Sequence, residues 1–120
     1  MPITQAINRQ KAKRIHVFCA AGNSGGRAAL GSPANAATWI VQSCTRERTR
    51  STFTDGPQWP TLKNRVYGIG DPIVAFFPGG IQGEAKGTSM ATPTAASCAV
   101  LLSAGGVYIP LAWQTGELAA

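Results

Sequence analysis

One serine in the sequence stands where its hydroxyl could act as a nucleophile. Ser89 lies within residues 87–93, at the start of a stretch of small and apolar residues that is typical of a buried helix. The first N–H groups of a helix lack partners and its dipole is positive there, so an oxyanion that develops beside Ser89 would be stabilised. The alternative is that Thr88 or Ser89 only caps the helix, which is the commoner role for an isolated serine at this place.

Asn23 is a second candidate, and by itself it is equally ambiguous. It stands in the glycine-rich segment 22–26, which follows an apolar run and is typical of a loop. Asparagine in such a loop is commonly a turn former that tolerates positive φ. Its side-chain amide could also donate a hydrogen bond to an oxygen of a ligand.

Two segments of the sequence predict helices that would frame these residues. Residues 2–14 place Ile3, Ala6 and Ile7 on one face, with polar residues between them. Residues 88–103 have the length and the small-residue content of a buried helix. Pro93 falls in the opening turns of this second helix, where proline is tolerated best.

Short apolar runs between the helices predict strands. Their continuous apolar character is typical of strands covered on both faces, as in a parallel sheet. The alternation of helices and strands favours an α/β layered fold, and open sheets of that class bind ligands at the carboxyl ends of their strands. The expected strands are residues 15–21, 39–44 and 73–77, with further strands and surface loops within 45–70 and a turn-rich stretch at 79–87.

The two motifs, in this order, resemble those of the subtilisin-like serine proteases, and of the proteinase K type in particular. The heptapeptide Gly-Thr-Ser-Met-Ala-Thr-Pro at residues 87–93 is highly specific, and residues 20–25 read Ala-Ala-Gly-Asn-Ser-Gly. The resemblance implies a partial subtilisin-like three-layer α/β fold, with a mostly parallel sheet and a central helix that bears the nucleophile. It covers roughly residues 7–102. We expect a partial catalytic domain over residues 1–104 and a divergent tail over 105–120.

The resemblance also implies a role for each matching residue. Ser89 would be the nucleophile that forms an acyl-enzyme with the scissile carbonyl. The side-chain amide of Asn23 and the backbone N–H of Ser89 would stabilise the oxyanion, and Thr88 would help to place the nucleophile. Small residues would wall the pocket for a large apolar side chain before the cleaved bond; these are Ala20, Ala21, Gly22, Gly31, Ser32 and Pro33.

The catalytic base that the resemblance implies has no counterpart in the sequence. The family carries its Asp and His upstream, on an Asp-Thr/Ser-Gly and a His-Gly-Thr segment, and neither occurs here. The single histidine, His16, lies in an expected strand, and Asp55 and Asp71 stand in surface-like turns, so we interpret all three as structural. We therefore expect the chain alone to be inactive, although it resembles a serine endopeptidase. The alternative is a catalytically dead fragment or binding remnant of a subtilase.

The charge and hydropathy of the chain exclude several other classes of protein. Eleven Lys+Arg against five Asp+Glu leave a net charge of +6, but the two basic clusters, near residues 9–14 and 46–50, lack interleaved aromatic residues. We therefore do not expect nucleic acid as a partner, and a basic nucleic-acid-binding module is the weaker alternative. No apolar run reaches the roughly 18 residues of a membrane helix, so we expect no membrane partner.

Three scattered cysteines offer neither a disulfide scaffold nor a zinc site, so we expect Cys19, Cys44 and Cys98 to be buried free thiols. The acidic residues show no clustered spacing for calcium, and we assign no metal and no cofactor. The partners implied by the resemblance are a peptide or protein substrate and a missing amino-terminal half of the same domain. Nothing in the sequence assigns a cellular location.

Overall fold

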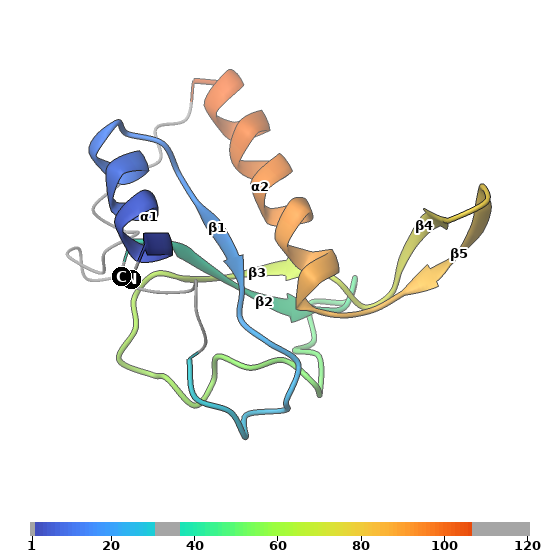
Figure 1. Cartoon of the computed structure of the whole chain (residues 1–120). Coiled ribbons are helices and arrows are strands. Elements are labelled where there is room, and N and C mark those ends of the chain that lie inside the picture. Colours follow the sequence, from blue (N-terminus) through green and yellow to red (C-terminus); the bar gives the residue numbers. More distant parts are fainter. Residues whose placement is uncertain (1, 31–36, 107–120) are drawn as a thin grey trace.

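The computed structural model describes residues 2–30 and 37–106 (Figure 1). Helices stand at both ends of this region and five strands lie between them. In chain order the elements are α1 (Pro2–Ala12), β1 (Phe18–Ala20), β2 (Trp39–Cys44), β3 (Arg65–Ile69), β4 (Ile73–Phe77), β5 (Ile81–Ala85) and α2 (Thr88–Ala104).

The first three strands form a parallel sheet in the order β1-β2-β3. Phe18 pairs with Trp39 at one end of the sheet, and Cys44 pairs with Ile69 at the other. The central strand β2 is buried, and its residues Ile40 and Val41 have no exposed surface. The expected α/β class and the expected parallel sheet are both confirmed, and β2 has the expected bounds.

Helix α2 runs across one face of this sheet and packs against all three of its strands (Figure 1). Two glycines at the end of β3 allow the close approach. A Cβ atom added at Gly70 would lie 2.8 Å from the backbone nitrogen of Ala91, and one at Gly68 would also meet the Ala91 backbone. The helix begins at Thr88 as expected and ends one residue later than the sequence predicts.

The segment 79–87 differs from its prediction because it contains a strand. Ile81–Ala85 pairs antiparallel with β4, with Phe77 opposite Ile81 and Ile73 opposite Ala85. Gly79 and Gly80 supply positive φ at the turn, and cross-strand hydrogen bonds then order the polar residues that follow. The hairpin projects away from the sheet (Figure 1), so the apolar strand β4 is not covered on both faces as expected.

The first strand is shorter than the sequence predicts, and so is the first helix. Helix α1 ends at Ala12, and Arg14 has a φ of 61°, which turns the chain before it enters the sheet. Ile15 is exposed, and pairing with β2 begins only at Phe18. The apolar run 15–21 is therefore longer than the strand, because hydrogen-bonded pairing with β2, and not apolar composition, sets the ends of β1.

The prediction that all three cysteines are buried is wrong in part. All three thiols are free; Cys19 is buried, Cys44 is half-buried and Cys98 is exposed on α2. Burial raises the pKa of the Cys19 and Cys44 thiols, and a hydrogen bond from Thr38 partly offsets the effect at Cys19. Among the described residues, no group of three or more His, Cys, Asp or Glu side chains could hold a metal ion. Neither described helix has the length and apolar character that crossing a membrane requires.

Candidate active site

The candidate site lies where the start of α2 meets the carboxyl ends of the parallel strands. The N–H of Gly87 donates to the carbonyl oxygen of Gly70, directly after β3, at 2.9 Å. The N–H of Thr88 donates to the side-chain oxygen of Asn23, in the loop after β1, at 2.8 Å. Tertiary structure thus brings together two motifs that are 65 residues apart in sequence.

Hydrogen bonds fix the orientation of the Asn23 amide. Its Oδ1 accepts from the backbone N–H of Thr88 and, at 3.0 Å, from the Thr88 hydroxyl. A backbone N–H is only a donor, so the atom facing it must be the oxygen, and the NH₂ group takes the other side. Asn23 is exposed, and in the described part of the chain no acceptor engages its Nδ2. Two hydrogens are therefore available to an outside oxygen.

Thr88 joins the Asn23 loop to the helix. Its side chain has no exposed surface, and its Oγ1 accepts from the N–H of Gly22 at 3.1 Å while it donates to Asn23 Oδ1. Both hydrogen bonds of this hydroxyl are thus made with the loop. The contact brings Gly22 and Asn23 against the first turn of α2.

Ser89 is the second residue of α2, and it is exposed. The N-cap is Gly87, which has no side-chain cap, and the first helical N–H is capped from outside the helix by Asn23. Ser89 therefore does not serve as a cap. No described residue accepts from its N–H, which is one of the unpaired donors of the first turn.

The residues expected to wall a substrate pocket are only partly described. Ala20 ends β1 and is half-buried, Ala21 is buried, and Gly22 has a φ of 115°. All three precede Asn23 on the same strand and loop. The rest of the expected wall, Gly31, Ser32 and Pro33, lies outside the described residues.

His16 lies at the opposite end of the sheet from Ser89. Its Nδ1 accepts from the indole N–H of Trp39, the first residue of β2, at 3.0 Å, and the two rings are 6.2 Å apart between centroids. Ser89 lies near the last residues of the strands, and a six-residue strand spans on the order of 17 Å. A general base must come within about 3 Å of its nucleophile, so His16 is not placed to activate Ser89.

Asp55 lies beside the site, and its burial differs from the prediction. It is only 2% exposed, whereas the Asp-Gly pair predicted a surface turn. Its carboxylate accepts from the N–H groups of Ser24 and Gly26 and from the side chains of Ser24 and Gln58. An adjacent Asp and Gly predict a turn, but they do not indicate which distant loop packs against that turn and buries the Asp side chain.

Burial disfavours ionisation of Asp55, but its hydrogen bonds outweigh the effect. The side chain of Ser24, the backbone of Gly26 and Ser24, and the side chain of Gln58 together hold the pKa of the Asp55 carboxyl below its usual value. The carboxyl is therefore an anion at neutral pH. No basic side chain takes part in these hydrogen bonds among the described residues.

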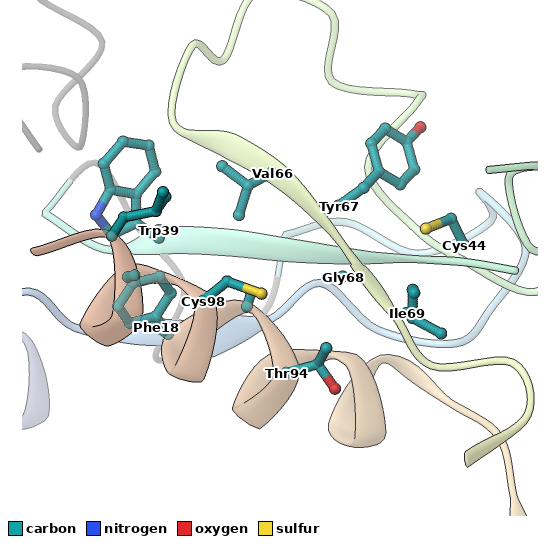
Figure 2. Close-up of a pocket in the computed structure, with 12 residues that line it drawn as sticks. Phe18, Trp39, Cys44, Val66, Tyr67, Gly68, Ile69, Thr94 and Cys98 are labelled. Carbon is teal, nitrogen blue, oxygen red and sulfur yellow. The ribbon is translucent and has the colours of Figure 1, made fainter. Parts of the chain in front are cut away.

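An apolar hollow of about 380 Å³ lies between α2 and β3, and Ser89 and Asn23 do not line it (Figure 2). Val66 and Tyr67 line it from the sheet, and Thr94 and Cys98 line it from the helix. Its lining offers no pair of groups arranged for acid–base chemistry. The start of α2 therefore remains the candidate site.

Comparison with known proteins identifies similar sequences. The subtilase family model matches residues 2–114. Subtilisin-like protease 4 of Arthroderma gypseum is 36% identical over 98 residues, which are 81% of this chain and 24% of that protein. Subtilisin-like protease 3 of Arthroderma benhamiae is 33% identical over 105 residues, or 87% of this chain and 25% of that protein.

Solved structures share the fold. The prenylagaramide maturation protease PagA superposes with a TM-score of 0.73 at 23% identity, over 89% of this chain and 40% of its own. The self-cleaved protease domain of PatA gives a TM-score of 0.73 at 22% identity, over 93% of this chain and 49% of its own. The chain thus spans about a quarter of the matched curated relatives and less than half of these solved chains.

Proposed function

We propose a function from one established premise: the chain belongs to the subtilase family and has part of the subtilisin-like α/β fold. The proposed function is serine endopeptidase chemistry, the hydrolysis of peptide bonds in a peptide or protein substrate. The observation that carries it is the bond from the Thr88 N–H to Asn23 Oδ1, which sets an available amide beside the unpaired N–H of Ser89.

In the proposed reaction, Ser89 Oγ attacks the scissile carbonyl carbon while a base removes the hydroxyl proton. The carbonyl oxygen becomes an oxyanion, which Asn23 Nδ2 and the Ser89 N–H stabilise. Collapse of this intermediate transfers the proton to the leaving amine and leaves an acyl-enzyme, which water hydrolyses. Loss of such an amide donor costs about 3 kcal/mol in the transition state, a magnitude that comes from subtilisin, a member of the same family.

The base for this reaction would come from a second polypeptide segment, the amino-terminal half of the domain. The one histidine is bonded to Trp39 at the far end of the sheet. Strand β1 is an edge of the parallel sheet among the described strands, so a further strand could pair with it. We propose that the complementing half adds to this edge and supplies the triad Asp and His.

A catalytically dead fragment is the second candidate, and the position of His16 favours it for the chain alone. Ser89 without a base is a weak nucleophile at neutral pH. In this case the Asn23 amide and the Ser89 N–H would still bind a carbonyl oxygen or an anion, but no bond would be cleaved.

Hydrolysis of an apolar, internally quenched peptide distinguishes the two candidates. The full chain is assayed alone and with an excess of the amino-terminal catalytic half of a subtilisin-like relative, with Ser89→Ala as the matched control. We expect no turnover by the chain alone and turnover in the mixture that Ser89→Ala abolishes. A stable complex without turnover would support the catalytically dead fragment. Turnover by the chain alone that depends on Ser89 would refute the expectation that this chain lacks a catalytic base.

A further inference from the structure

The proposed chemistry makes no use of Asp55, although this buried carboxylate has unusually many partners. It accepts from the Gly26 N–H at 2.7 Å, from the Ser24 N–H at 3.1 Å, from the Ser24 hydroxyl, and from Gln58 Nε2 at 3.2 Å. Three of these four donors belong to residues 24–26, immediately after Asn23 in the chain.

The backbone around Asp55 holds the other side of the same loop. The Asp55 N–H donates to the carbonyl oxygen of Gly22 at 2.9 Å, and the N–H of Gly25 donates to the carbonyl oxygen of Phe53 at 2.8 Å. The contact with Gly22 is close: a Cβ atom there would lie 2.5 Å from Asp55 Oδ2, at a φ of 115° that favours glycine. Asn23 thus lies between two residues, Gly22 and Ser24, that both hydrogen-bond to Asp55.

We infer that Asp55 is a positioning residue for the Asn23 amide, holding the loop backbone while Thr88 holds the amide oxygen from the helix. The inference rests on the proposed function, because the position of Asn23 matters for catalysis only if its amide stabilises the oxyanion. Displacement of a catalytic group by about 1 Å can cost 10²-fold in rate, so the position of this loop bears directly on kcat.

The negative charge of Asp55 is suited to this task. A carboxylate only accepts hydrogen bonds, and all four of its partners here are donors. An asparagine in its place would direct its own NH₂ group at one or more N–H donors. The isosteric change Asp55→Asn therefore disturbs the loop without creating a cavity.

Nuclear magnetic resonance of the ¹⁵N-labelled full chain tests the positioning without any need for activity. We expect the Asn23 side-chain NH₂ resonances and the Ser24 and Gly26 amides to titrate together as acid is added, with one midpoint below that of an ordinary Asp. Arg65 is the charged side chain that contacts the same turn, where it donates a hydrogen bond to the Gly56 carbonyl oxygen. Titration of the two backbone amides without the Asn23 NH₂ group would overturn the inference.

Two variants complete this experiment. Asp55→Asn should abolish the shared titration and shift the Asn23 NH₂ resonances, while Glu84→Gln, which removes an exposed carboxylate on β5, should change neither. Unchanged Asn23 resonances in Asp55→Asn would overturn the inference. If Asp55→Asn fails to fold, the titration of the unmodified chain decides.

A double-mutant cycle in the complemented enzyme separates positioning from general structural support. We expect Asp55→Asn to lower kcat about 10- to 100-fold with KM little changed, and to have no further effect once Asn23→Ala is present. Equal effects in both backgrounds would overturn the inference. Absence of turnover from every variant, with the resonance results intact, would instead count against the proposed peptidase function.

Discussion

At the scale of single residues, the candidate site depends on which atom of Asn23 faces the helix. The Thr88 N–H settles this, because it can only donate and so requires the amide oxygen. The buried Thr88 hydroxyl reinforces the arrangement by linking Gly22 to the same oxygen. The site is therefore assembled by a threonine that neither attacks nor stabilises charge in the proposed reaction.

Thr88→Val tests this linkage because it keeps the side-chain shape and removes both hydrogen bonds. We expect a loss of about 1–3 kcal/mol in the free energy of unfolding, since the Gly22 N–H loses its partner in a part-buried position. Denaturant titration measures the loss. Thr94→Val on the same helix removes one local bond to the Met90 carbonyl oxygen and should cost less. Equal losses would show that Thr88 has no special role.

Asp55 gives the stability of the chain a defined dependence on pH. Its pKa is lower in the folded state than in the unfolded state, where an Asp titrates near pH 4. Its contribution is therefore complete above about pH 4 and is lost as the pH falls through the lower folded pKa. Denaturant unfolding from pH 7 to pH 3 should show this decline, and Asp55→Asn should flatten it. An equally steep decline in the variant would assign the dependence to other groups.

At the scale of elements, two glycines of the β3 end determine where α2 begins. A Cβ atom at Gly70 would lie 2.5 Å from the Gly87 carbonyl oxygen and 2.8 Å from Ala91 Cβ. The Gly87 N–H also donates a hydrogen bond to the Gly70 carbonyl oxygen. This contact therefore sets both the distance of the helix start from the sheet and the residue at which the helix begins. Because Ser89 follows two residues later, packing of the helix on the sheet places the proposed nucleophile.

Gly70→Ala should accordingly displace the start of α2. We expect a loss of about 1–3 kcal/mol in the free energy of unfolding, the usual cost of overpacking. Circular dichroism during denaturant unfolding measures it. Gly105→Ala adds the same methyl group at the other end of the helix, where the nearest atoms lie at 3.5 Å, and should change the stability by less than about 0.5 kcal/mol. A neutral Gly70→Ala would refute the close approach.

At the scale of the whole molecule, large apolar side chains remain exposed on two elements. Leu101 and Val100 near the end of α2 are 72% and 67% exposed, and Phe76 and Ile81 on the hairpin are 77% and 67% exposed. The unpaired edge of β1, among the described strands, and the hollow beside α2 add to this uncovered surface. Exposed apolar surface of this extent is typical of an interaction site or of a protein that associates.

We therefore expect the chain alone to self-associate as its concentration rises. Sedimentation at increasing protein concentration should show an increasing fraction of oligomers. Because the Leu101 side chain is exposed, Leu101→Gln should lower that fraction without lowering the stability of the fold. Ser103→Gln on the same exposed turn provides a control that removes no apolar surface. A monomer at every concentration would contradict this expectation.

Local features of the sequence were enough to establish the family, the α/β class and the bounds of β2 and β4, because specific motifs and apolar runs are properties of short stretches of chain. The same motifs predicted Ser89, Asn23 and Thr88 as site residues. They could not reveal strand β5, whose polar residues are ordered by pairing with β4.

Long-range contacts alone establish which way the Asn23 amide points, that Asp55 is buried beside its loop, and that His16 lies at the far end of the sheet. These contacts join residues between 23 and 66 positions apart. They follow from the parallel pairing of the strands and from the packing of α2 on them, and no short stretch of sequence specifies either.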